Sequence, residues 1–257
     1  MLISLLGILY FLVFAPRSAF SLFEFIAYPG AITQCDVFNV SFSKGTLPAA
    51  LPLSLTILPF NSTPLAFTVP NSAWDNSTSS GSFAITLPLP AGVALLAALD
   101  DAAGHSAAPI SDVIQVQPSP NTSCLSSNTT VPVPFQLVDS TVSQCSPFSV
   151  SRNTSSLDNP ISARGFIPGS QSFKLKWAAY RESDGVDMFT FIMSVAQGID
   201  VAMLFDDGLG NCQVSDLLAV QGNENSPNGC LQPGSPLSTS AALGGSQSLS
   251  RSANRLQ

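Results

Sequence analysis

Apolar and polar residues alternate along several short segments of this chain. Alternation at period two places every second side chain on one face of an extended backbone, so it predicts strands that are buried on one side. Clusters of Pro, Gly, Asn and Ser separate the segments, as turns require. The predicted strands cover residues 37–42, 53–58, 65–69, 81–87, 93–99 and 113–116, and further along 173–177, 189–191 and 200–205. Because Ala and Leu dominate 93–99, a short helix is the alternative there.

The same pattern occurs twice, with the second copy displaced by about 106 residues. Equivalent pairs recur in the same order: Gln34–Cys35 with Gln144–Cys145, Asp100–Asp101 with Asp206–Asp207, Ser111–Asp112 with Ser215–Asp216, and Cys124–Leu125 with Cys230–Leu231. Apolar character is kept at equivalent strand positions: Phe67/Phe173, Val69/Leu175, Phe83/Phe189, Ile85/Phe191, Val93/Ile199, Leu95/Val201 and Leu99/Phe205. The chain therefore contains two tandem modules of roughly 100 residues, a size at which a module buries its own core.

Six or seven short strands per module, with turn signals between them, predict an all-β fold of two tandem immunoglobulin-like β-sandwiches. The first module spans residues 22–125 and the second spans 135–231, and a short polar linker at 126–134 joins them. Residues 232–257 are rich in Ser and Gly and predict a disordered tail.

Several features predict export from the cell. The apolar run at residues 2–15, followed by the small residues Ala19 and Ser21, predicts a signal peptide at 1–21; an uncleaved anchor is the alternative. Six Asn-x-Ser/Thr sequons are candidate glycosylation sites: Asn39, Asn61, Asn76, Asn121, Asn128 and Asn153. The tail lacks an apolar stretch, so we expect membrane attachment only if a C-terminal span lies beyond this chain.

The five cysteines agree with an oxidising compartment. Cys35 and Cys124 open and close the first module, and Cys145 and Cys230 do the same in the second, so we expect one disulfide within each copy. In the chain-entropy model, closing a loop of that length stabilises a module by roughly 4–5 kcal/mol. Cys212 is left over, as a buried free thiol, an intermolecular bridge or a competitor for the second disulfide.

Charge excludes one class of partner. The net charge is −7, and the nine basic residues are not clustered, which argues against nucleic acid. The doublets Asp100–Asp101 and Asp206–Asp207 precede glycines and predict turn caps; a weak calcium site helped by Asp112 or Asp216, and catalytic carboxylates, are the alternatives. The single histidine, His105, is expected on a solvated loop, and no motif predicts a catalytic residue, a metal or a cofactor.

Aromatic side chains are the remaining candidates for binding. Exposed aromatic rings on β-sandwiches stack on sugars, and Trp74, Trp177 and Tyr180 are the candidates. Trp177 ends a Phe-x-Leu-x-Trp alternation, which predicts a core position. Trp74 lies in a turn-like segment beside a sequon, and we therefore expect Trp74 to be the exposed ring and the possible sugar contact.

The repeated motifs carry a family resemblance. Each module opens on Cys-x-x-Phe-x-Val, from Cys35 and from Cys145, and closes on Asp-x-x-Gly followed by Ser-Asp-x-x-x-Val and Cys-Leu. Over residues 33–231 the chain resembles uncharacterised fungal secreted or membrane-anchored surface proteins, and more loosely fungal cell-wall proteins of the Kre9/Knh1 type.

The resemblance implies Ig-like modules and no catalytic residues. It predicts a non-enzymatic extracellular glycoprotein of the fungal cell surface or wall, with a structural or interaction role and with wall polysaccharide or surface proteins as possible partners. A carbohydrate-binding or adhesive module is the alternative.

Overall fold

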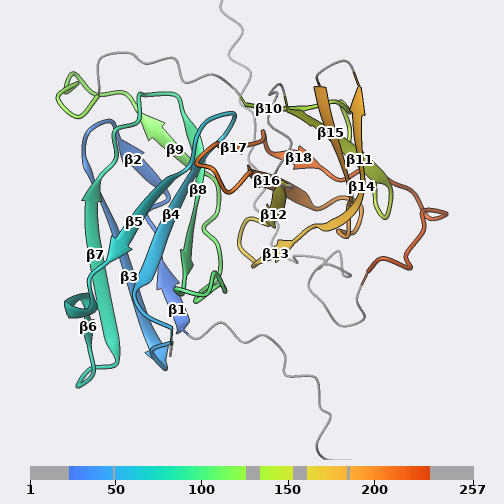
Figure 1. Cartoon of the computed structure of the whole chain (residues 1–257). Coiled ribbons are helices and arrows are strands. Elements are labelled where there is room, and N and C mark those ends of the chain that lie inside the picture. The colour runs from blue at the N-terminus through green and yellow to red at the C-terminus, as the bar shows by residue number, and fades with distance from the viewer. Residues whose placement is uncertain (1–22, 49, 126–133, 153–160, 184–185, 232–257) are drawn as a thin grey trace, which may run out of the picture.

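The computed structural model describes residues 23–48, 50–125, 134–152, 161–183 and 186–231. The expected signal peptide and tail, most of the linker, Asn128 and Asn153 lie outside these residues. The described elements are all strands except for one 3₁₀ turn, η1 (Asn71–Ala73), and they form two pairs of sheets that lie side by side (Figure 1). The predicted all-β fold of two sandwich modules is confirmed, and its immunoglobulin-like character stays a prediction.

The first module encloses its core between two sheets. One sheet has the order β1 (Phe23–Ala27), β3 (Val37–Gly45), β7 (Ser80–Thr86), β6 (Trp74–Asp75). The other has the order β2 (Ala31–Thr33), β9 (Ile114–Gln117), β8 (Ala94–Asp100), β4 (Leu53–Pro59), β5 (Leu65–Val69). All neighbours are antiparallel except β2 and β9, which run parallel. Alternate residues such as Phe38, Val40 and Phe42 on β3 fill the core.

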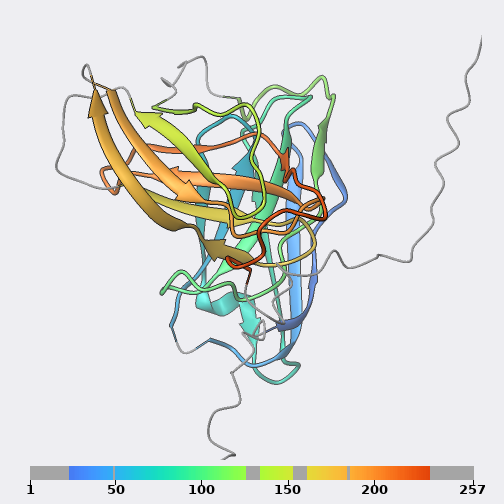
Figure 2. The ribbon, with the colours of Figure 1, turned by 90° about the vertical axis from the view of Figure 1, so that its right-hand side faces the viewer.

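The second module repeats this plan. Its first sheet has the order β10 (Phe135–Leu137), β11 (Pro147–Arg152), β15 (Val186–Ile192), β14 (Lys176–Ser183). Its second sheet has the order β13 (Ser172–Lys174), β12 (Ser162–Phe166), β16 (Asp200–Asp206), β17 (Cys212–Val214), and β18 (Leu218–Ala219) also pairs with β16. The β14–β15 hairpin lies at the outer side of the second module, away from the first (Figures 1 and 2).

Most strand predictions are confirmed, including the strand at 93–99, which forms β8 rather than a helix. The expected pairs Phe83/Phe189 and Ile85/Phe191 occupy the same register positions in the two modules. The expected equivalence of Phe67 and Phe173 is wrong by two residues. Ile57 and Gly165 are equivalent positions in the two modules; Ile57 pairs with Leu65, and Gly165 pairs with Phe173, so the true counterpart of Phe173 is Leu65. The expected strand at 173–177 is also wrong, because the chain leaves one sheet after Lys174 and enters the other at Lys176.

Both predicted disulfides are confirmed. Cys35 is bonded to Cys124 and Cys145 to Cys230, with Cα–Cα distances of 5.3 and 5.4 Å. The first cysteine of each pair has a left-handed backbone, with φ of 59° at Cys35 and 54° at Cys145. The repeat is therefore preserved down to an unusual backbone conformation.

The sheet that contains β4 and β8 and the sheet that contains β12 and β16 are each covered on both faces. On β8 every residue from Leu95 to Asp100 is buried, whereas a sheet with one face in water alternates. One face lies against the module's own core and the other against the second module. The shared cluster consists of Leu58, Leu96, Ala98, Ile110, Phe166, Ala202 and Val214, with Phe60, Val113, Leu204 and Leu217 at its border.

Equivalent residues of the two modules meet in this shared cluster. Leu58 corresponds to Phe166, Leu96 to Ala202, and Ile110 to Val214. Backbone hydrogen bonds occur in matching pairs: Asn61 N to Ser215 O and Gly169 N to Ser111 O, both 3.3 Å, then Val214 N to Ser62 O, 2.8 Å, and Ile110 N to Ser170 O, 2.6 Å. The modules thus pack as an internal pseudo-twofold dimer, with the same patch used on both sides.

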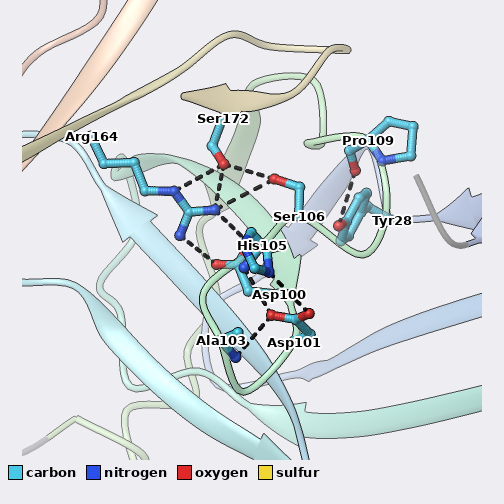
Figure 3. Close-up of polar contacts among 9 residues, drawn as sticks. All are labelled: Tyr28, Asp100, Asp101, Ala103, His105, Ser106, Pro109, Arg164 and Ser172. Atoms are coloured by element: carbon cyan, nitrogen blue, oxygen red, sulfur yellow. Dashed lines mark hydrogen bonds and ion pairs between the residues drawn. The ribbon is translucent and has the colours of Figure 1, made fainter. Parts of the chain in front are cut away.

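One polar contact breaks this symmetry. Arg164 of β12 donates to both carboxylate oxygens of Asp100 on β8, at 2.6 and 2.8 Å, and also to Ser172 (Figure 3). The hydroxyls of Ser106 and Ser172 lie 2.7 Å apart beside it. The position equivalent to Arg164 in the first module is Thr56, so the twofold-related ion pair to Asp206 does not form.

Candidate functional site

The acidic doublets serve mainly as turn caps. Asp101 accepts hydrogen bonds from the backbone N–H groups of Ala103 and His105, at 2.9 and 2.8 Å (Figure 3). Asp207 does the same for Leu209 and Asn211, at 2.8 and 3.2 Å. The predicted capping role is confirmed for Asp101 and Asp207, whereas Asp100 pairs with Arg164 instead. For each carboxyl, burial alone would raise the pKa, but these hydrogen bonds outweigh it and hold the pKa below its usual range.

The doublets do not converge on one point. Asp100 turns to Arg164, while Asp101 binds its own loop (Figure 3). The side chain of His105 is 77% exposed, and its Nδ1 lies 3.4 Å from Asp101 Oδ2, as expected for a histidine on a solvated loop. In the part of the chain that the structure describes, no three His, Cys, Asp or Glu side chains gather as a metal site would require.

The ranking of the two tryptophans is wrong. Trp74 is half-buried: its ring stacks on Phe42 at 6.1 Å with 3° between the planes, and its Nε1 donates to Asn76. Trp177, expected in the core, is 52% exposed. The reason is the sheet change after Lys174, since an alternation that continues across two different sheets no longer defines one face.

A β-bulge brings Trp177 and Tyr180 to the same face of the edge strand β14. Trp177 lies opposite Phe191 and Tyr180 opposite Phe189, with a register shift between Trp177 and Ala179. Residues three apart on a regular strand point to opposite faces, but the extra residue of a bulge restores the same face. Because β14 is the edge of its sheet, Trp177 is 52% exposed and Tyr180 41% exposed. We call these two side chains the aromatic face.

Buried residues hold Tyr180 in place. Its hydroxyl donates to Asp187 Oδ1 at 2.9 Å, and its ring lies 5.2 Å from the ring of Phe189. Asp187 in turn accepts a hydrogen bond from Arg152 Nη2 at 2.9 Å, and Arg152 Nη1 lies 3.8 Å from Asp207 Oδ2. Loss of solvent around the phenol and the bond to Asp187 raise the pKa of Tyr180 to about 12. The ring is therefore neutral and oriented at physiological pH.

Sequence reasoning missed this network of Tyr180, Arg152, Asp187 and Asp207. Arg152 is 1% exposed and occupies the inward position after Phe148 and Val150 on β11. The first module has Phe42 where the second has Arg152, and Gly81 where the second has Asp187. A signal was present, since an arginine continues an apolar alternation, but its partners are distant in sequence.

Two equivalent grooves flank the module interface. One, of about 340 Å³, is lined by Asn61, Phe135, Gln136, Leu137, Phe205, Gln213, Ser215, Asp216 and Leu218. The other, of about 320 Å³, includes Gly169, Ser111, Asp112 and Ile114, which are the repeat equivalents of Asn61, Ser215, Asp216 and Leu218, together with residues 24–30. We call them the Asn61 groove and the Gly169 groove.

Cys212 is the free cysteine among the described residues and is half-buried on β17. Burial, followed by the charge of Asp206, raises the pKa of its thiol to about 11. Its counterpart in the first module is Ser106. The backbone of Ser106 forms a β-bridge with Asp100, just as the backbone of Cys212 pairs with Asp206.

The comparisons with known proteins do not place the chain in a family. No family model matches it, and no curated protein matches it. In the described residues, we find no helix with the length and apolar character to cross a membrane.

Proposed function

We propose that this protein is a non-enzymatic extracellular glycoprotein of the fungal cell surface or wall, with a structural or interaction role. The observation that carries the proposal is the placement of the sequons. All four sequon asparagines within the described residues, Asn39, Asn61, Asn76 and Asn121, are exposed. Each of these side chains is accessible for attachment of a sugar in the folded protein. The two disulfides support passage through an oxidising compartment.

The use of the acidic residues supports a role without catalysis. Asp101 and Asp207 are committed to backbone N–H groups of their own loops, and Asp100 is committed to Arg164. General acid–base catalysis instead needs a titratable group aimed at a substrate.

Expression in a fungal host tests this proposal. We expect the protein in the medium or wall fraction, with a mobility shift on peptide-N-glycosidase treatment and with both disulfides formed. An unglycosylated, intracellular, fully reduced product would refute it. Supplying a cleavable heterologous leader to a second sample separates a failure of export from a failure of the modules.

A carbohydrate-binding role is the second candidate, and the aromatic face favours it. Trp177 and Tyr180 present two aromatic rings on one face, and Asp187 fixes the second ring. Aromatic rings held in this way contact the apolar faces of sugar rings at little entropic cost.

Co-sedimentation with insoluble chitin and β-glucan tests this second role. We expect Trp177→Ala to lose binding, whereas Leu209→Ser, which removes a side chain that is 61% exposed elsewhere, retains it. Because Trp177 and Leu209 are both exposed surface residues, both variants should fold. Equal binding by wild type and Trp177→Ala would exclude the aromatic face.

A further inference from the structure

The two grooves beside the module interface are equivalent by the repeat but differ in one residue. Asn61 and Gly169 occupy the same position, and both have a left-handed backbone, with φ of 55° and 68°. Glycine and asparagine are the residues that adopt this conformation most readily. Only the first begins a sequon, because Asn61-Ser62-Thr63 corresponds to Gly169-Ser170-Gln171.

The Asn61 groove has the chemistry that a sugar ring needs. Its apolar side chains include Leu137 and Leu218, both half-buried, and its polar side chains include Gln136 and Asp216, both exposed. A volume of about 340 Å³ falls within the range of small-molecule sites, which combine an apolar lining with a few polar groups.

Asn61 ties this groove to both modules. Its exposed side chain lies in the groove wall, which belongs mainly to the second module, while its backbone N–H donates to Ser215 O across the interface at 3.3 Å. The attachment point of a glycan is thus already inside the groove, so a glycan attached there loses little translational and conformational entropy when it binds the groove.

We propose that the N-linked glycan of Asn61 lies in the Asn61 groove, with its first N-acetylglucosamine against Leu137 and Leu218, and stabilises the pairing of the two modules. The inference rests on the proposed function as a glycoprotein. The twofold-related Gly169 groove carries no sequon and stays open.

Glycopeptide mass spectrometry of the secreted protein is the first test, and we expect Asn61 to be occupied. An unmodified Asn61 beside glycosylated Asn39 or Asn76 overturns the inference and leaves the proposed function intact. Absence of glycan from every sequon overturns both.

Accessibility is the second test. Under native conditions we expect peptide-N-glycosidase to release the Asn61 glycan about tenfold more slowly than the Asn39 glycan, because release requires local opening of the groove. After denaturation the two rates should agree. Equal rates in the native protein overturn the inference.

A matched pair of variants completes the test. Thr63→Ala removes the Asn61 sequon while keeping Asn61 and its backbone conformation, and Asn39→Gln removes a sequon from the exposed side of β3. We expect a lower thermal midpoint for Thr63→Ala and an unchanged one for Asn39→Gln, with no difference when both are made unglycosylated. Equal midpoints in the glycosylated proteins overturn the inference.

Discussion

Asp100 and Arg164 lie on different modules, and the guanidinium donates to both oxygens of the carboxylate at 2.6 and 2.8 Å. The side chain of Asp100 is 6% exposed and that of Arg164 is 21% exposed. Bidentate pairing of this kind fixes the relative orientation of the two partners as well as their distance. The pair therefore sets the register of one sheet against the other across the apolar cluster.

Removing Arg164 should destabilise the molecule more than removing both partners. In Arg164→Met the buried carboxylate of Asp100 loses its counter-charge, which costs about 2–4 kcal/mol in the free energy of unfolding. The double variant Arg164→Met with Asp100→Asn should recover part of this loss. Urea unfolding of both single variants and the double variant gives the coupling free energy. Additive effects would contradict a direct interaction.

The buried Arg152–Asp187 pair allows a swap designed from the first module. Arg152→Phe leaves Asp187 buried and should cost about 3–5 kcal/mol. Adding Asp187→Gly reproduces the arrangement of Phe42 and Gly81 and should cost less than the sum of the two single changes. Thermal unfolding of the four proteins measures this. A double variant as unstable as the sum would show that the two modules have diverged too far at this position.

Stability should fall at acid pH because of the turn caps. The pKa of Asp207 is depressed in the folded protein, so its contribution is present above the unfolded value of about 4 and is lost as the pH falls through the folded value. Asp207→Asn should therefore be less stable than wild type at pH 7 and show a flatter loss below pH 4. Thermal midpoints between pH 2 and 7 test this, with exposed Asp216→Asn as the control. Parallel curves would contradict it.

Cys212 should react slowly with alkylating agents. With its thiol pKa raised to about 11, the thiolate fraction at pH 8 is small, and iodoacetamide should react about a hundredfold more slowly than with a free cysteine. In denaturant the rate should rise to the ordinary value. Mass spectrometry of timed samples measures both rates, and fast labelling of the native protein would show that the thiol is accessible and ionised.

The strand positions could be predicted from the sequence because period-two alternation is a local property. The exposure of Trp177 could not, since it depends on where the chain changes sheets and on a bulge between Trp177 and Ala179. The module interface is also visible in the sequence, as a strand with apolar residues at nearly every position. The almost uninterrupted apolar run of β8 is typical of a strand covered on both faces.

The candidate site was predicted only in its residue types. Trp177 and Tyr180 were among the aromatic candidates, but the choice of Trp74 followed from its turn-like surroundings, which do not reveal the packing against Phe42. Asp187 and Arg152 went unnoticed because they meet only through the pairing of β11 with β15. Sequence pattern therefore identified side chains with binding chemistry, and tertiary structure decided which of them are exposed.

The two disulfides also determine how this molecule responds to being pulled. Each joins the opening of its module to its close, Cys35 to Cys124 and Cys145 to Cys230, so tension applied outside the modules crosses each one through a covalent bond. The strands between the cysteines carry no load. Between the two disulfides the path runs through the roughly 20 residues from Cys124 to Cys145, which include β10 and extend to about 70 Å at most. Under force the two sandwiches would separate along their shared face, and among the described strands β1, β2 and β10, which lie outside the cysteine loops, would be pulled from their sheets first. The strands between the cysteines would stay folded and would template re-pairing once the force is released.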